Sequence, residues 1–143
     1  MRTRKTMAVL ALALVLAGCG SEAGPTPKGG GEVATDPAAL ATKLRVYTAD
    51  TCFTAPEQQA PKGCAKYVTE LGGTVGMVRQ QVSAKHPNLN ALADALDKNV
   101  AAYRAAQCDA VEAPGNPCSA TLRAIADSVR DIKQVIDTQI ANG

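Results

Sequence analysis

The stretch that decides the fold is SATLRAIADSVRDIKQVIDTQIA, residues 119–141 of a 143-residue chain. Its large aliphatic side chains recur every three or four residues, at Leu122, Ile125, Val129, Ile132, Ile136 and Ile140. This spacing places them on one face of an α-helix. Ser119 stands where a hydroxyl would cap the first turn. We therefore predict a helix over residues 120–141 whose apolar face must be covered by other helices.

Two segments before it show the same periodicity. Asp36 followed by Pro37 is typical of a helix start and predicts a helix over residues 37–50. A second helix is predicted over residues 63–85, where apolar residues alternate in steps of four and three, as in a heptad repeat, at Cys64, Val68, Leu71, Val75, Val78 and Val82.

A third segment, residues 89–107, follows His86-Pro87-Asn88, where Pro87 disfavours helix at the preceding residue and Asn88 can cap. No strand pattern competes with these helices. Short connections between four amphipathic helices favour an all-α, up-down-up-down four-helix bundle formed by residues 36–143.

The chain begins with a segment typical of exported proteins, MRTRKTMAVLALALVLAGC, residues 1–19. Basic residues precede an apolar run that is too short to span a membrane. The run ends at Leu16-Ala17-Gly18-Cys19, which resembles the lipobox of bacterial lipoproteins. The resemblance implies that residues 1–18 are a cleaved signal peptide and that Cys19 carries a covalent lipid. It covers only these nineteen residues and assigns no family to the rest of the chain.

Removal of the signal peptide would change the net charge of the mature protein. Three of the fifteen Lys and Arg residues lie in the signal, whereas all thirteen acidic residues follow it, so no basic footprint for nucleic acid remains. Residues 19–35 are rich in Gly and Pro and predict a flexible tether after the lipidated cysteine. The Ala- and Gly-rich composition is similar to that of small lipoproteins of high-G+C Gram-positive bacteria. We expect a lipid-anchored protein on the extracytoplasmic face of the cell membrane.

Four cysteines remain once Cys19 is assigned to lipid. They lie at the edges of two Pro-containing loops, CFTAPEQQAPKGC and CDAVEAPGNPC. An even set in an exported chain indicates disulfides. The spacing fits neither a C-x-x-C redox centre nor a Cys₄ zinc site. Local pairs, Cys52–Cys64 and Cys108–Cys118, are favoured, although cross-loop pairing at the same end of the bundle stays open.

The few aromatic residues are expected at this disulfide-bearing end, which in a bundle faces away from the tether. They are Tyr47, Phe53, Tyr67 and Tyr103. Two interpretations compete. The rings can fill the end of the core, or they can form a surface that contacts a partner protein.

Three glycines interrupt the segment LGGTVGM, although glycine destabilises a helix by about 1 kcal/mol relative to alanine. Gly72 and Gly76 lie beside the heptad seam and could let two helices approach closely, form a homodimer contact, or border a ligand site. Gly73 falls on the outer face, and the sequence offers no reason for it.

The sequence lacks the motifs that usually indicate an enzyme. The single histidine, His86, is far from Ser119 in a bundle, and no G-x-S-x-G motif, phosphate-binding loop, haem motif or Glu-x-x-His pair is present. We expect no metal or cofactor other than the lipid on Cys19. The leading hypothesis is a non-enzymatic module that docks another envelope protein. The alternative is a binder of small apolar molecules near Gly72 and Gly76, and an enzyme comes third.

Overall fold

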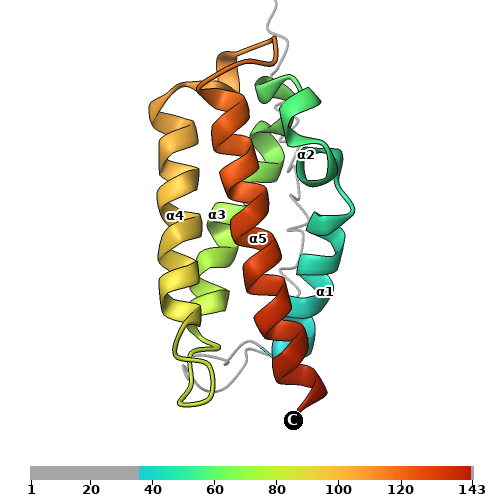
Figure 1. Ribbon diagram of the computed structural model, residues 1–143, viewed down its shortest axis with the longest axis vertical. Coiled ribbons are helices and arrows are strands. Elements are labelled where there is room, and N and C mark those ends of the chain that lie inside the picture. Colours follow the sequence, from blue (N-terminus) through green and yellow to red (C-terminus); the bar gives the residue numbers. More distant parts are fainter. Residues whose placement is uncertain (1–35, 143) are drawn as a thin grey trace, which may run out of the picture. The chain divides into compact units, whose positions relative to one another are not determined.

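The computed structural model describes residues 36–142. The expected signal peptide, Cys19 and the tether lie outside the described residues. Within this range all regular elements are helical and no strand is present, so the all-α prediction is confirmed. The elements in chain order are α1 (Pro37–Thr48), α2 (Thr51–Thr54), η1 (Pro56–Gln58), η2 (Pro61–Cys64), α3 (Ala65–Arg79), α4 (Leu89–Ala105), η3 (Cys108–Ala110) and α5 (Cys118–Ala141) (Figure 1).

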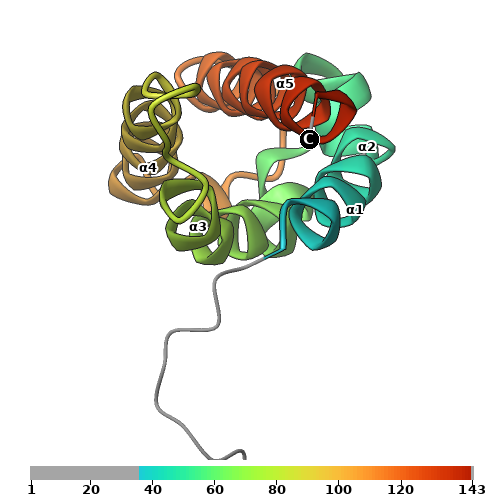
Figure 2. The ribbon, with the colours of Figure 1, turned by 90° about the horizontal axis from the view of Figure 1, so that it is seen from below.

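The longer helices surround one apolar core. α5 packs against both α4 and α1, α3 packs against α4, and α1 meets α3 over far fewer residues. Figure 2, which looks along the helices, shows α4, α5, α1 and α3 around a common centre. Each helix contributes the face predicted from its periodicity, and the largest fully buried aliphatic side chains are Leu40, Leu44, Val68, Leu71, Val78, Leu89, Leu96, Leu122, Ile125, Ile132 and Ile136.

The helix starts agree with the sequence at one position and differ at two. Asp36 caps α1, since its carboxylate accepts a hydrogen bond from Ala38 N at 3.0 Å. Asn88 and Ser119 do not cap as predicted. Asn88 makes no capping bond, and α5 begins earlier, at Cys118, because Pro117 already has helical dihedral angles. The Ser119 hydroxyl instead accepts a hydrogen bond from Gly115 N at 2.9 Å.

The prediction for the end of the second long helix was wrong. α3 ends at Arg79 rather than at residue 85, and i→i+3 backbone bonds from Gln81 to Val78 and from Val82 to Arg79 tighten its last turn. Val82, expected in the seam, is 41% exposed. The heptad repeat located the buried face of α3, but it could not locate the end, because that depends on where the chain turns back toward α4.

Candidate functional site

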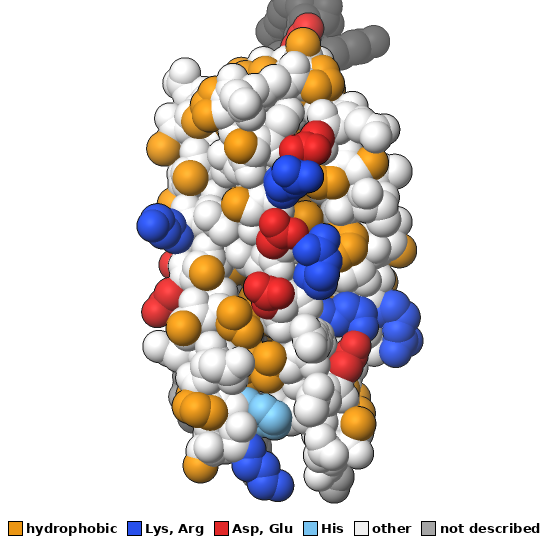
Figure 3. Space-filling view, viewed as in Figure 1, with side chains coloured by type: hydrophobic (Ala, Val, Ile, Leu, Met, Phe, Trp, Pro, Cys, Tyr) orange, Lys and Arg blue, Asp and Glu red, His pale blue; other side chains and the backbone are white. Residues whose placement is uncertain are grey.

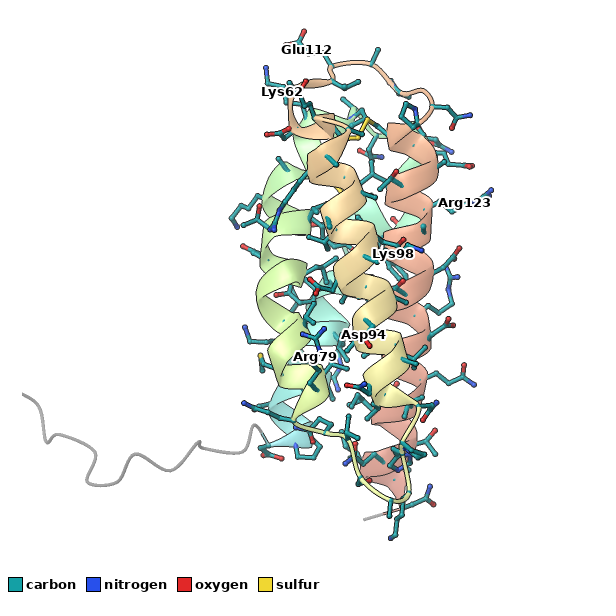
Figure 4. All side chains as sticks on the ribbon, turned by 90° about the vertical axis from the view of Figure 1, so that its left-hand side faces the viewer. Lys62, Arg79, Asp94, Lys98, Glu112 and Arg123 are labelled. Carbon is teal, nitrogen blue, oxygen red and sulfur yellow. A yellow bond between two sulfur atoms is a disulfide. The ribbon has the colours of Figure 1, made fainter. Side chains whose placement is uncertain are left out.

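Both disulfides lie at one end of the helices and close their loops locally. They join Cys52 to Cys64 and Cys108 to Cys118, with Cα–Cα distances of 5.8 and 5.5 Å. The two loops are also joined to each other, because Lys62 N donates to Val111 O at 2.9 Å and the Lys62 ammonium pairs with Glu112 at 2.9 Å (Figure 4). We call the surface formed by residues 50–64 and 106–118 the disulfide end.

The three tyrosines do not form the partner-facing surface that the sequence allowed. Tyr47, Tyr67 and Tyr103 are only 8%, 5% and 2% exposed. Tyr47 and Tyr67 meet edge to face with ring centroids 6.1 Å apart, and the Tyr103 hydroxyl donates to Pro61 O at 2.6 Å. The rings are buried because they fill the core below the loops, and Tyr103 ties α4 to η2.

Phe53 is the aromatic side chain that stays partly exposed. The Arg130 guanidinium lies over its ring, 5.5 Å from the centroid, which is a cation–π geometry. Beside it, Arg123 of α5 pairs with Glu57 of η1 at 3.1 Å. These residues line a polar hollow of about 290 Å³ between the α2–η1 segment and α5. Phe53, which belongs to the disulfide end, and Arg130 of α5 beside it are thus accessible contact residues.

The glycines of α3 have separate roles. At Gly72 a Cβ atom would lie 3.3 Å from Val100 Cγ1 and 3.1 Å from a guanidinium nitrogen of Arg104, both on α4. A missing side chain therefore lets α3 and α4 approach closely at this point. A Cβ at Gly76 would meet nothing within 4 Å, so the expectation of close packing fails at Gly76, which faces open space.

Gly73 lines a groove between α1 and α3, which make the least contact among the neighbouring long helices. The groove has a volume of about 500 Å³ and is lined by Thr42, Lys43, Val46, Tyr47, Glu70, Gly73 and Thr74; we call it the α1–α3 groove. A Cβ at Gly73 would meet nothing within 4 Å, and Val46 is 66% exposed. The absent side chain of Gly73 thus keeps the groove open.

The groove combines an apolar lining with polar groups. The Tyr47 hydroxyl and the buried Thr74 hydroxyl lie 3.3 Å apart, which links α1 to α3. A second hollow of about 220 Å³, lined in part by Asp50, Lys66 and Tyr67, shares Glu70 with it. Lys66 pairs with Glu70 at 2.9 Å, and this hydrogen bond raises the pKa of the exposed Lys66 ammonium.

The groove does not include Gly72 or Gly76, where the sequence suggested that a ligand could bind, and the sequence did not reveal it. The available signals were two residues without a place in the core pattern. Val46 lies off the apolar face of α1, and Gly73 lies off the seam of α3. Each is unremarkable alone, because only the packing of α1 beside α3 brings them together.

The Tyr67 hydroxyl is enclosed and has no hydrogen-bond partner among the described residues. Burial raises the pKa of this hydroxyl, and the nearby negative charge of Asp50 raises it further. A buried polar group without a partner costs about 1–3 kcal/mol. The hydroxyl of Tyr67 therefore lowers the stability of the domain, although its buried ring is part of the core.

We expect Tyr67→Phe to stabilise the domain by about 1 kcal/mol at neutral pH, since it removes the unpartnered hydroxyl and keeps the ring. The effect should grow in alkali. The raised pKa means that the unfolded chain loses this proton first, at about pH 10. Below about pH 10 the titration of Tyr67 does not change the free energy of unfolding. Above about pH 10 it lowers the free energy of unfolding of the wild type, whereas Phe at position 67 has no proton to lose. Urea unfolding at neutral pH and above pH 10 measures both effects, and equal pH dependence of the two proteins would refute the assignment.

Several charged residues between residues 36 and 142 form ion pairs. Arg79 of α3 binds Asp94 at 2.8 Å and lies 3.5 Å from Asp97, so this acidic pair of α4 serves an interhelical salt bridge (Figure 4). Figure 3 shows acidic and basic side chains interspersed on one face. In the part of the chain described, no three His, Cys, Asp or Glu side chains are placed to hold a metal ion.

None of the helices within residues 36–142 has the length and apolar character needed to cross a membrane. Comparison of the chain with protein-family models, curated proteins and solved structures finds no match.

Proposed function

We propose that the protein is an extracytoplasmic lipoprotein, anchored through Cys19, whose helical domain is a non-enzymatic interaction module of the cell envelope. The lipobox resemblance of Leu16-Ala17-Gly18-Cys19 supports the anchor. Two local disulfides within the domain are consistent with an oxidising compartment. We further propose an up-down-up-down bundle topology, which the contacts between neighbouring helices and the short connections support.

The single observation that carries the docking role is the rigid disulfide end. Each of its loops is closed covalently, and Lys62 joins one loop to Val111 and Glu112 of the other. A surface that is ordered before binding loses little conformational entropy on association. Phe53 belongs to this surface and Arg130 lies beside it, and aromatic and arginine side chains commonly dominate binding energy. The described chain starts at Asp36, at the opposite end of α1, so a tether would present this surface away from the membrane.

The anchor and the docking surface are tested by separate variants. We expect Cys19→Ala to abolish incorporation of labelled lipid and to release the protein from the membrane fraction. In-cell crosslinking followed by mass spectrometry should capture an envelope protein, and Phe53→Ala should reduce this capture without lowering the unfolding temperature by more than a few degrees. Val82→Ala, an exposed apolar change in the α3–α4 connection, is the matched control. Labelled lipid on the Cys19→Ala protein would overturn the anchor, and capture unaffected by Phe53→Ala would overturn the surface.

A second candidate function, the binding of small molecules with apolar parts, is favoured by the α1–α3 groove. Ligand sites commonly have volumes of about 300–1,000 Å³ and combine apolar lining with a few polar groups. The groove has about 500 Å³ and both kinds of lining. It replaces the Gly72–Gly76 flank as the candidate location, because α4 packs against Gly72 and neither Gly72 nor Gly76 lines the groove.

A further inference from the structure

We propose that the α1–α3 groove binds a single-chain anionic amphiphile, with its apolar chain over Gly73 and Val46 and its anionic group at Lys43. This inference rests on the second candidate function and is independent of the disulfide end.

The shape of the groove carries the first step. α1 is held mainly by α5, so its other side meets α3 only loosely and leaves about 500 Å³ unfilled. Gly73 provides a stretch of groove wall without a side chain, and Val46 keeps 66% of its surface exposed. An unbranched apolar chain laid along the groove would cover Val46 and the Gly73 backbone. This burial would stabilise the complex, because apolar surface of both the chain and the groove is removed from water.

The composition of the groove disfavours a purely apolar occupant. The Tyr47 and Thr74 hydroxyls, 3.3 Å apart, are present within the lining together with the charged ends of Lys43 and Glu70. A ligand with both an apolar chain and a polar group satisfies this mixture.

The charges of the groove decide the sign of that polar group. Glu70 is already neutralised by Lys66 at 2.9 Å. Lys43 forms no ion pair with any of residues 36–142, so the groove lining keeps one uncompensated positive charge. A carboxylate or phosphate at the end of an acyl chain complements it. Both chemistries occur, in free fatty acids and in lysophospholipid head groups respectively.

The probes are dodecanoate and dodecyl phosphate, titrated below their micelle concentrations into the folded domain and followed by calorimetry. We expect saturable binding of at least one of them, and the tighter of the two distinguishes a carboxylate source from a phosphate source. Dodecyltrimethylammonium has the same chain and the opposite charge, so it should bind more weakly. Equal binding of the cationic probe would overturn the role of Lys43.

Gly73→Leu fills the groove from within. It should fold, because a Cβ there meets nothing within 4 Å, and it should weaken binding by about tenfold or more, since displacing two CH₂ groups from apolar contact has that effect. Gly76→Leu is the matched control on the same helix, because it also points to open space but lines no part of the groove. Undiminished binding by Gly73→Leu, or equal loss in Gly76→Leu, would refute the site.

Lys43→Gln should weaken binding of the anionic probes by about two- to fivefold, the range of an exposed ion pair, and leave binding of dodecanol unchanged. Lys98→Gln, on α4 away from the groove, is the control (Figure 4). If no amphiphile binds while Gly73→Leu abolishes capture of an envelope protein, the groove is a protein-docking site and the amphiphile is wrong. If no amphiphile binds but Phe53→Ala still reduces capture of an envelope protein, the amphiphile proposal is wrong and the docking function is supported.

Discussion

Replacing Cys108 and Cys118 together by alanine is expected to lower the free energy of unfolding by about 3 kcal/mol. The bond closes a loop with a sequence separation of 10, and its loss lets the unfolded chain sample many more conformations. Cys108 and Cys118 are 0% and 2% exposed, so alanine is preferred to serine, which would bury a hydroxyl without an assured partner. Urea unfolding followed by circular dichroism measures the change.

The Cys52–Cys64 pair provides the matched comparison. Its sequence separation is 12, so the corresponding double alanine variant should lose a similar amount of stability. Adding a reductant should destabilise each double variant by the contribution of its remaining disulfide and the wild type by both. A variant that keeps full stability, or peptide mapping that finds Cys52 joined to the other loop, would contradict the local pairing.

Ile132→Ala is expected to destabilise the domain by about 2–5 kcal/mol. Ile132 is fully buried on α5, the helix that packs against both α4 and α1. Truncation removes apolar contacts with the core and leaves a cavity that surrounding helices can fill only partly. The same urea titration gives the difference in unfolding free energy, with an unchanged m-value indicating that the fold is retained.

Ile140→Ala is the control for this prediction. It makes the same chemical change on the same helix, eight residues further along, where the side chain is 43% exposed. We expect its cost to be about 1 kcal/mol or less, because a partly exposed side chain loses less apolar contact. Equal losses at the two positions would show that α5 does not bury its central face as described.

Local sequence signals correctly predicted those features of the helices that depend on neighbouring residues. The apolar spacing of Leu122 to Ile136 located the buried face of α5, and Asp36 with Pro37 marked the start of α1. Both depend only on residues within a few turns. The compartment suggested by the lipobox, together with the loop positions of the cysteines, likewise favoured the pairs that the structure contains.

Other features depended on residues far apart in the chain. α3 ends at Arg79 although its heptad continues to Val82, because the chain leaves the helix to return as α4. Tyr103 continues the apolar spacing of α4 and is buried, but only the fold brings its hydroxyl to Pro61, forty-two residues away, which accepts its hydrogen bond. Periodicity could not reveal where α3 ends or which group accepts the hydrogen bond of Tyr103.

What the sequence by itself determined is which side of each helix is apolar and where covalent links and an anchor are expected. Only the tertiary structure decided which neighbouring helices pack closely and which leave a groove between them. Gly72 lies against Val100 of α4, whereas the adjacent Gly73 opens the groove beside α1. Two identical residues thus have opposite consequences, because a missing side chain allows close packing only where another helix is near enough to use the space.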